Sequence, residues 1–329
     1  MQIKDIGEQG LLKRLFAYCD RDKNGDDGAI LSVSKGKKLV VSTDLLVEGV
    51  HFSSKTLTPE AIGHRAATAN LSDIAAMGGK PLHATVGLSL RKETEVAWVE
   101  KLYEGMSSLF ARYSCTIVGG DVTRSQTNTI AITILGEVNP KQIIYRNRAR
   151  VGDVIVVTGN HGLSRGGLAL LTGNYDNIPE ATREKLIAAH ATPNPRLDVI
   201  EYINSQFPHH RIAGMDTSDG LADAITQICR NSGVGARIDR RKINIDDTLL
   251  QLTDIDTAFE WVLYGGEDFE LVLCLEPEKA SLLQLRFGKD CQIIGEITPQ
   301  QEIVVYDSLG IYPQENLEPE KTFQHFGVY

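Results

Sequence analysis

Residues 58–79, TPEAIGHRAATANLSDIAAMGG, contain the start, the body and the end of one predicted helix. Thr58 is a good N-cap residue, and Pro59 fits the first helical turn, where the backbone N–H needs no partner. Small apolar residues recur at helical spacing as far as Met77, and the pair Gly78-Gly79 ends the pattern. The stretch therefore predicts a helix over residues 58–77, with a strand over residues 82–90 directly after it.

Helix-type and strand-type patterns alternate along the rest of the chain in the same way. Further helices are predicted over residues 8–18, 93–112, 164–171, 178–189, 196–206 and 222–231. Further strands are predicted over residues 29–33, 38–42, 116–118, 130–138, 154–158, 236–239, 269–275, 292–297 and 303–306. This alternation indicates an α/β or α+β class with mixed sheets.

The length of 329 residues favours two domains. The chain becomes basic in Tyr145–Arg150, and a Val-Gly-Asp turn then leads into the strand predicted over residues 154–158. We therefore expect an N-terminal domain of residues 1–148 and a C-terminal domain of residues 149–329.

The overall composition excludes several classes of protein. The net charge of −9 argues against nucleic-acid binding, which usually shows a basic face. No run of about 20 uncharged apolar residues occurs, so no membrane span is expected. The first residues lack the apolar core of a signal peptide, and the five cysteines are scattered without a C-x-x-C pair, which predicts reduced thiols in a cytoplasmic protein.

Acidic residues flanked by Gly, Ser, Thr or Asn recur where predicted elements end or begin. They are Gly25-Asp26-Asp27, Ser42-Thr43-Asp44, Asn70-Leu71-Ser72-Asp73, Gly119-Gly120-Asp121, Asp216-Thr217-Ser218-Asp219-Gly220 and Gly265-Gly266-Glu267-Asp268. Together they suggest one acidic pocket, and like charges at close range need compensation. Mg²⁺ prefers such oxygen ligands, so the set predicts metal-dependent phosphate chemistry.

Each motif also has a simpler local explanation. Asp44 at the end of a strand fits a turn, and Gly119-Gly120 fits either a tight turn or a backbone that approaches a phosphate. Ser218 or Asp219 is a natural N-cap for the helix that follows. The segment from Asp20 to Gly25 matches half of a calcium-binding loop, but Leu31 stands where the bidentate Glu is required.

Other nucleotide and metal signatures are absent from the sequence. No P-loop, no dinucleotide-binding glycine pattern and no zinc-type cluster occurs, and His209-His210 is expected in a solvated loop. Two anionic reactants in an acidic pocket without a P-loop lysine require cations. Arg146 offers a bidentate clamp for a phosphate.

In this order, the motifs resemble the thiamine-monophosphate kinase family, which belongs to the superfamily of aminoimidazole ribonucleotide synthetase. The resemblance rests on Ser-Thr-Asp with Glu48–Phe52 just after it, Asn-Leu-Ser-Asp-Ile-Ala-Ala-Met-Gly, Gly-Gly-Asp-Val-Thr-Arg and Gly-Gly-Glu-Asp. It implies an N-terminal domain that binds ATP and Mg²⁺ and dimerises through its sheet into a shared barrel. It also implies a C-terminal α/β domain that packs across the cleft and completes the substrate site.

The resemblance implies phosphorylation of thiamine monophosphate by ATP in thiamine diphosphate biosynthesis. Transfer would be direct and in line, with no phosphoenzyme and no catalytic side chain beyond those that position metal and phosphate. The implied ligands of several Mg²⁺ ions are Asp27, Ser42, Thr43, Asp44, Asp73, Asp121, Asp216 and Asp219. The implied ATP contacts are Tyr103, Gly120, Asp121, Arg146 and Ser218, and the implied substrate contacts are His51, Glu267 and Phe323.

The chain departs from the family pattern at two places. Lys23-Asn24 replaces a Gly-Ile pair before the first Asp-Asp motif, and Phe323 stands where the family often has Trp. Two other functions remain open on the sequence. One is a ligase-type relative that activates an amide or formyl oxygen with ATP, and the other is a non-catalytic calcium-binding or anion-binding module.

Overall fold

The computed structural model describes residues 1–20, 22–23 and 28–323 of the chain. Two compact units are present: an N-terminal unit of Met1–Ile74 and Gly79–Pro140, and a C-terminal unit of Ala75–Gly78 and the chain from Lys141 onward. The C-terminal unit thus begins before the predicted boundary at residues 148 and 149. Ser232 of the C-terminal unit binds the residues around the predicted boundary, because its hydroxyl donates to Arg146 O and accepts from Ala149 N. These contacts help to place Arg146 in the C-terminal unit.

The N-terminal unit contains one four-stranded sheet in the order β1-β4-β2-β3. Its strands are β1 (Lys38–Val47), β2 (Lys80–Leu90), β3 (Thr116–Arg124) and β4 (Thr129–Val138). β2 and β3 are parallel, whereas β4 pairs antiparallel with both β1 and β2. The sheet is therefore mixed, as predicted.

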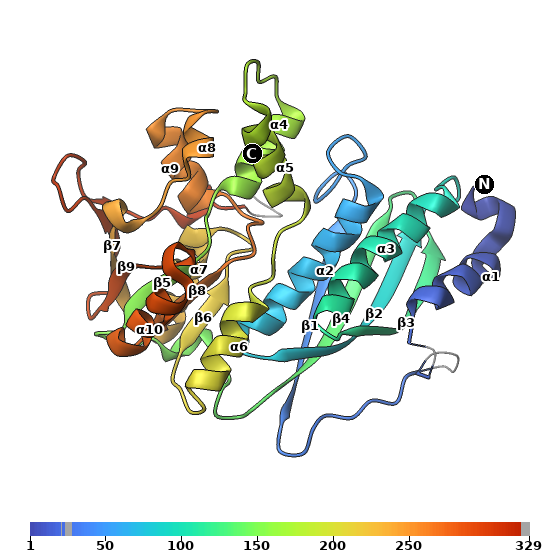
Figure 1. Ribbon diagram of the computed structural model, residues 1–329, viewed down its shortest axis with the longest axis horizontal. Coiled ribbons are helices and arrows are strands. Elements are labelled where there is room, and N and C mark those ends of the chain that lie inside the picture. Colours follow the sequence, from blue (N-terminus) through green and yellow to red (C-terminus); the bar gives the residue numbers. More distant parts are fainter. Residues whose placement is uncertain (21, 24–27, 324–329) are drawn as a thin grey trace. The chain divides into compact units, whose positions relative to one another are not determined.

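Helices cover one face of this sheet (Figure 1). They are α1 (Ile3–Leu15, followed by a 3₁₀ turn over Phe16–Tyr18), α2 (Pro59–Ala76) and α3 (Val96–Arg112). Ile130, Ile132 and Ile134 of β4 are fully buried, while the residues between them are partly exposed. This alternation is typical of a sheet with one covered face, and the predicted helix over residues 58–77 is confirmed as α2.

Two strands are longer than predicted. β1 was expected to end at Ser42 but continues to Val47, because Leu45, Leu46 and Val47 extend the ladder with β4. β3 was expected to end at Val118 but runs on to Arg124, so Gly119-Gly120-Asp121 lies inside a strand and forms no turn.

The strand predicted over residues 29–33 is wrong. These residues form no ladder with any described strand, and Ile30 is 92% exposed. The apolar side chains there have no covered sheet face to occupy, so the β-type composition alone does not produce a strand.

The C-terminal unit contains a seven-stranded sheet in the order β11-β10-β7-β9-β5-β8-β6. The strands are β5 (Val154–Thr158), β6 (Ala213–Asp216), β7 (Gly235–Asp239), β8 (Leu271–Leu275), β9 (Cys291–Thr298), β10 (Ile303–Tyr306) and β11 (Glu315–Asn316). β8 is buried along its whole length, as expected for a central strand with both faces covered. β6 was not predicted, because its four residues, Ala-Gly-Met-Asp, show no strand-type alternation.

Seven helices accompany this sheet within the described residues. They are α4 (Leu163–Thr172), α5 (Glu180–Ala191), α6 (Leu197–Gln206), α7 (Leu221–Ser232), α8 (Asp247–Leu250), α9 (Ile255–Tyr264) and α10 (Pro277–Phe287). The four helices predicted from the sequence correspond to α4–α7. No described helix is both long and apolar enough to cross a membrane.

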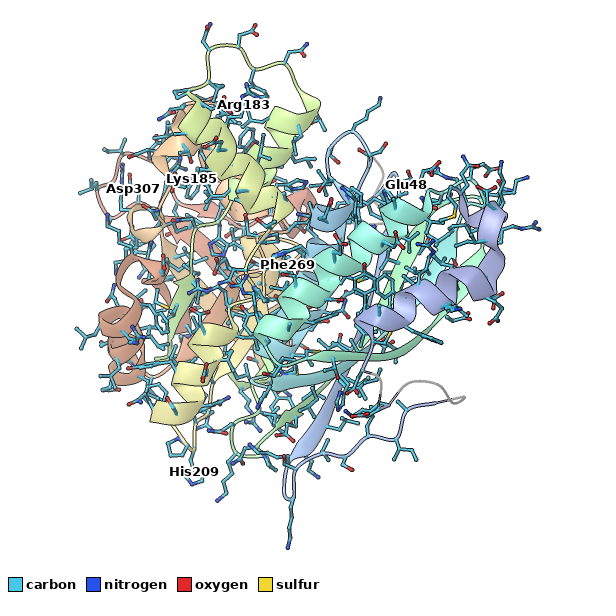
Figure 2. All side chains as sticks on the ribbon, turned by 45° about the vertical axis from the view of Figure 1, so that its right-hand side comes forward. Glu48, Arg183, Lys185, His209, Phe269 and Asp307 are labelled. Atoms are coloured by element: carbon cyan, nitrogen blue, oxygen red, sulfur yellow. The ribbon has the colours of Figure 1, made fainter. Side chains whose placement is uncertain are left out.

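The loop after α6 differs from its prediction at one residue. His209 is exposed, and Figure 2 labels it. His210, expected in solvent, is buried instead. Burial, together with the charges of Lys279 and Arg148, lowers the pKa of His210 to about 4.

Candidate functional site

Two of the predicted acidic residues of the N-terminal unit, Asp44 and Asp73, lie on the covered side of its sheet. Val40, Ser42, Asp44 and Leu46 are every second residue along β1, so Ser42 and Asp44 point to the same face as the buried Val40 and Leu46. The Ser42 hydroxyl donates a hydrogen bond to Asp73 of α2. Sequence reasoning expected a strand end here, whereas the structure places these oxygens in the middle of a strand.

Thr43 occupies the opposite face of β1. Its hydroxyl lies 2.9 Å from the Thr133 hydroxyl of β4, beside the exposed Leu39, Val41 and Leu45. The side chain of Thr43 is therefore separated by the sheet from those of Ser42 and Asp44.

Gly120, the second glycine of the pair on β3, has a packing role. A Cβ atom on Gly120 would lie 2.0 Å from Val86 O of the neighbouring β2, so only glycine fits there. Asp121, the next residue, is exposed on this edge strand. The sequence signal that suggested a phosphate-binding backbone is thus already explained, in part, by close strand contact.

Two further predicted residues of this unit have defined surroundings. The His51 ring is oriented by Val47 N, which donates to His51 Nδ1 at 3.0 Å. Tyr103 on α3 is buried, with its ring centroid 5.7 Å from that of Tyr18, and burial raises its pKa. Asp27 lies outside the described residues.

In the C-terminal unit, two short loops carry the predicted acidic residues. Residues 217–220 connect β6, which ends at Asp216, to α7, and residues 265–270 connect α9 to β8. Asp216 is buried at the end of β6, and the Ser218 hydroxyl donates to its carboxylate at 3.2 Å. The N-cap of α7 is Gly220 without a side-chain cap, so the prediction of Ser218 or Asp219 as N-cap is wrong.

Backbone hydrogen bonds join these two loops directly. Glu267 N donates to Ser218 O at 2.7 Å, and Thr217 N donates to Glu270 O at 2.9 Å. Glu267 and Phe269 both have positive φ, 67° and 54°, which is unfavourable for residues other than glycine. Such strained conformations persist where the surrounding structure fixes them, and they concentrate at functional sites.

Asp268, which lies between those two strained residues, binds the N-terminus of helix α4. Its carboxylate accepts hydrogen bonds from Gly162 N at 2.7 Å and from Ser164 N at 2.8 Å, at the start of α4. Burial raises the pKa of Asp268 to about 7, although the two backbone donors oppose the rise. One acid of the predicted cluster is therefore bound to the N-terminus of a helix.

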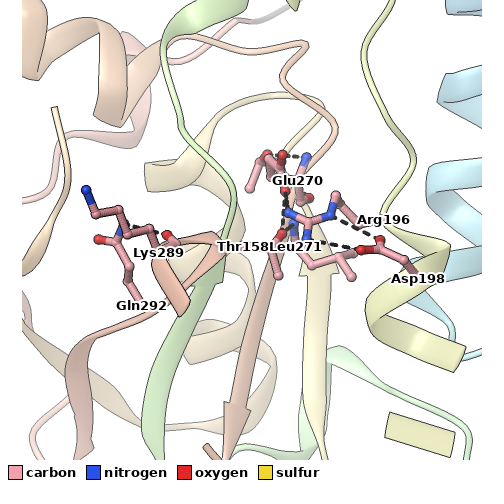
Figure 3. Close-up of polar contacts among 8 residues, drawn as sticks. Thr158, Arg196, Asp198, Glu270, Leu271, Lys289 and Gln292 are labelled. Carbon is pink, nitrogen blue, oxygen red and sulfur yellow. Dashed lines mark hydrogen bonds and ion pairs between the residues drawn. The ribbon is translucent and has the colours of Figure 1, made fainter. Parts of the chain in front are cut away.

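The sequence missed two charged residues beside these loops. The Glu270 carboxylate accepts from the Thr158 hydroxyl at 2.5 Å and from Arg196 at 2.7 Å, as Figure 3 shows. Arg196 also contacts Asp198. No pattern in the sequence connects Arg196 to Glu270, because 74 residues separate them.

The remaining predicted contacts also belong to the C-terminal unit. Arg146 is exposed, and its guanidinium donates to the Gln227 amide oxygen at 2.8 Å. Phe323 is 43% exposed and follows a segment held on α9, where Glu318 N donates to the Tyr264 hydroxyl. Asp307, labelled in Figure 2, accepts two hydrogen bonds from Arg241 and holds the turn after it through the backbone N–H groups of Leu309, Ile311 and Tyr312.

The described residues contain no group of three or more His, Cys, Asp or Glu that could hold a metal ion. Smaller sets of oxygen donors are present, namely Ser42 with Asp44 and Asp73, and Asp216 with Ser218. Asn70 Oδ1, one turn before Asp73, is buried and accepts no hydrogen bond from the described residues. Mg²⁺ typically binds through one or two carboxylates together with substrate phosphates, so these oxygen sets suit Mg²⁺ that arrives with a nucleotide.

Known proteins resemble this chain over its whole length. Residues 25–138 match the family described as AIR synthase related protein, N-terminal domain, and residues 150–308 match the corresponding C-terminal domain. A thiamine-monophosphate kinase of Synechococcus elongatus is 46% identical, over 99% of this chain and 98% of that protein.

Two solved structures share the fold as well. The crystal structure of a thiamine-monophosphate kinase from Stenotrophomonas maltophilia K279a is 30% identical, with a TM-score of 0.78 over 90% of this chain and 94% of that chain. A complex described as AaThiL with AMPPCP and TMP is 31% identical, with a TM-score of 0.75 over 99% of each chain. On this evidence the chain belongs to the thiamine-monophosphate kinase family.

Proposed function

We propose that this protein transfers the γ-phosphoryl group of ATP to thiamine monophosphate, which yields thiamine diphosphate and ADP. The observation that carries the proposal is the 46% identity to a thiamine-monophosphate kinase over nearly the full length of both chains. The structural relative solved with AMPPCP and TMP supports the same pair of reactants.

The chemistry requires little from a catalytic base. A phosphate oxygen of thiamine monophosphate attacks the γ-phosphorus, and the bond to the β–γ bridging oxygen breaks, so ADP leaves with the electron pair. The attacking oxygen is already ionised at neutral pH. The main barrier is to bring two anions together in line, and positioning and charge neutralisation lower it.

In the N-terminal unit we assign the metal and nucleotide contacts. Ser42 and Asp44 point to the covered face of the sheet, and the hydrogen bond from Ser42 orients the Asp73 carboxylate of α2. Bound Mg²⁺ would neutralise phosphate charge and hold the phosphates in position. The other proposed residues of this unit are Asp27, Thr43, Tyr103, Gly120 and Asp121, with His51 as a substrate contact. Thr43 would contribute through its backbone, because its side chain lies on the opposite face of β1.

In the C-terminal unit we assign the remaining contacts. Asp216 and Asp219 are the proposed metal ligands, Ser218 and Arg146 the proposed ATP contacts, and Glu267 and Phe323 the proposed substrate contacts. The thiazolium ring of thiamine is an aromatic cation, which suits a carboxylate and an aromatic side chain. The hydrogen bond between Glu267 and Ser218 supports this grouping, because it joins a substrate residue to a nucleotide residue.

We also propose that the protein is a homodimer that pairs through β1. Leu39, Val41 and Leu45 are 52%, 56% and 53% exposed on one face of this strand. β1 is also an edge strand. A contiguous exposed apolar row on an edge strand is a liability unless another chain covers it, and a second copy offers a matching row. The five free cysteines support a reducing compartment, the cytoplasm.

The proposal is tested by incubation with ATP, Mg²⁺ and thiamine monophosphate, followed by separation of the nucleotides and the thiamine esters. ADP and thiamine diphosphate should appear together, and neither should form when thiamine monophosphate is left out. ADP that forms at the same rate without thiamine monophosphate would refute the assignment of the acceptor.

A further inference from the structure

Thr217 is the residue through which the loop of Asp216 and Asp219 is fixed. It is fully buried and lies between Asp216 and Ser218. Thr217 N donates to Glu270 O, and Glu270 N donates back to the Thr217 hydroxyl at 3.1 Å. The position of this acidic loop is therefore set by the position of Glu270.

Glu270 is in turn held by its side chain. Its carboxylate accepts from Thr158 Oγ1 at 2.5 Å and from Arg196 Nη1 at 2.7 Å. The Thr158 hydroxyl also accepts from Leu271 N at 2.8 Å, which ties the first residue of β8 to the end of β5. Figure 3 shows these contacts converging on Glu270.

The surroundings leave the Glu270 side chain little freedom. A Cβ atom on Gly159, whose φ is +58°, would lie 1.9 Å from Glu270 Oε1, so the backbone passes close to the carboxylate. The side chains of Arg196 and Glu270 are only 5% and 14% exposed. A charge-assisted hydrogen bond between buried partners is short and directional, so it fixes orientation as well as distance.

Arg196 itself adopts an unusual backbone conformation. Its φ and ψ are both 31°, at the residue before α6, where a glycine or asparagine would be less strained. Asp198, two residues later, contacts the same guanidinium. The contacts of this guanidinium with two carboxylates offset the energetic cost of the strained backbone at Arg196. Such a conformation indicates that the position of the guanidinium is functionally constrained.

We propose that Arg196 is a positioning residue for the phosphoryl transfer. Through Glu270 and Thr217 it holds Asp216, Ser218 and Asp219 in the arrangement that meets the metal-bound nucleotide. This inference rests on the proposed function. Buried ion pairs contribute little net stability compared with apolar replacements, so a specific orienting role accounts for the pair better than stability does.

A second, partly buried Arg–carboxylate pair in the same unit provides the control. Arg211 donates two hydrogen bonds to Asp153, at 2.7 and 2.6 Å, just before β5 begins. Thr158 lies at the other end of the same strand. The two pairs are alike in chemistry, although the Arg211 side chain is 21% exposed and that of Arg196 only 5%. Of the two, the Arg196–Glu270 pair is the one hydrogen-bonded to the candidate loop through its backbone.

The test compares Arg196→Gln with Arg211→Gln. For each variant we would measure the melting temperature, kcat and KM. We would also measure the affinity for Mn²⁺–ATP in the absence of thiamine monophosphate, with water-proton relaxation as the readout of binding. Removal of a residue that orients metal ligands typically costs roughly 10–100-fold in metal affinity or activity, and we expect this range for Arg196→Gln. For Arg211→Gln we expect a similar loss of melting temperature with Mn²⁺–ATP affinity and kcat within about twofold of wild type.

Equal effects of the two variants on Mn²⁺–ATP binding and kcat would overturn the proposal. If Arg196→Gln does not fold, the comparison of Arg196→Lys with Arg211→Lys decides, because lysine keeps the charge and loses the planar fork. A wild-type protein that binds Mn²⁺–ATP but forms no thiamine diphosphate would refute the proposed function. The binding comparison would still test the role of Arg196.

Discussion

The hydroxyl of Ser42 donates a hydrogen bond to the carboxylate of Asp73, and this contact joins the middle of β1 to α2. Ser42 and Asp73 are 31 residues apart in the chain. Asp44 points to the same side of the strand. The N-terminal unit thus presents hard oxygen donors from two elements on the covered side of its sheet.

Asp44→Asn should lower kcat by roughly 100-fold while the protein remains folded, because an amide replaces a carboxylate in the proposed metal set. A higher Mg²⁺ concentration should be needed for half-maximal rate. Glu8→Gln on α1 is the control, since this exposed carboxylate belongs to none of the proposed contacts. Near-normal turnover and an unchanged Mg²⁺ requirement in folded Asp44→Asn would contradict the metal assignment.

Glu267→Gln should raise KM for thiamine monophosphate roughly tenfold, equivalent to about 1.4 kcal/mol, and leave KM for ATP nearly unchanged. The carboxylate is expected to face the cationic thiazolium, and the amide carries no charge. Glu260→Gln on α9 is the matched control, because this exposed residue contacts only Lys321 among the described ion pairs. A parallel rise of both KM values would show that Glu267 acts on the loop as a whole.

Val41→Lys should convert the proposed dimer into a monomer. A lysine in the exposed apolar row of β1 would place two ammonium groups near each other across a symmetric interface. Sedimentation velocity at several protein concentrations measures the change. A wild-type protein that sediments as a monomer throughout that range would refute pairing through β1.

Gly120→Ala should lower the free energy of unfolding by roughly 3 kcal/mol, because the new methyl group meets Val86 O and overpacks the sheet. Gly119→Ala is the neighbouring control, since the nearest atom to a Cβ there is Thr85 Cγ2 at 4.0 Å. Urea unfolding of both variants gives the comparison. Equal stabilities would mean that β2 and β3 are not packed as closely as described.

Acid should destabilise the protein through two buried histidines. Burial lowers the pKa of His161 and of His210 to about 4, from the ordinary value of 6.5. Between these values the unfolded chain binds more protons than the folded protein, so stability falls as the pH falls from 6.5 towards 4. Each histidine should account for a loss of roughly 2 kcal/mol between pH 7 and pH 5.

His161→Leu isolates one of these contributions. His161 Nε2 is buried and has no hydrogen-bond partner among the described residues, so leucine removes no such bond there. The variant should lose less stability than wild type between pH 7 and pH 5, as measured by urea unfolding at both values. Identical losses would show that the pKa of His161 does not differ between the folded and the unfolded protein.

The order and type of most elements followed from the sequence, because hydrophobic periodicity reports which face of a helix or strand is buried. Thr58, Pro59 and Gly78 mark both ends of α2 by local chemistry alone. Strand ends were harder to predict. Polar residues such as Ser42 and Asp44 resemble terminators, and only the partner strand β4 shows that β1 continues beyond them.

The sequence predicted which acidic motifs belong to the candidate site. It predicted only some of the contacts that their side chains make. The contact between Ser42 and Asp73 depends on how α2 lies on the sheet, which no local pattern encodes. Asp268 illustrates the opposite error, because an acid in the motif turned out to bind the N-terminus of α4. Arg196 gave no signal, since its role depends on a partner 74 residues away.

The most direct test of the central claim is to follow the γ-phosphoryl group itself. The protein would be incubated with Mg²⁺, thiamine monophosphate and ATP labelled with ³²P at the γ position, and the products would be separated by chromatography. The account predicts that all transferred label appears in thiamine diphosphate, in a one-to-one ratio with the ADP formed. Label released as inorganic phosphate in step with ADP would contradict it and would favour a ligase-type reaction.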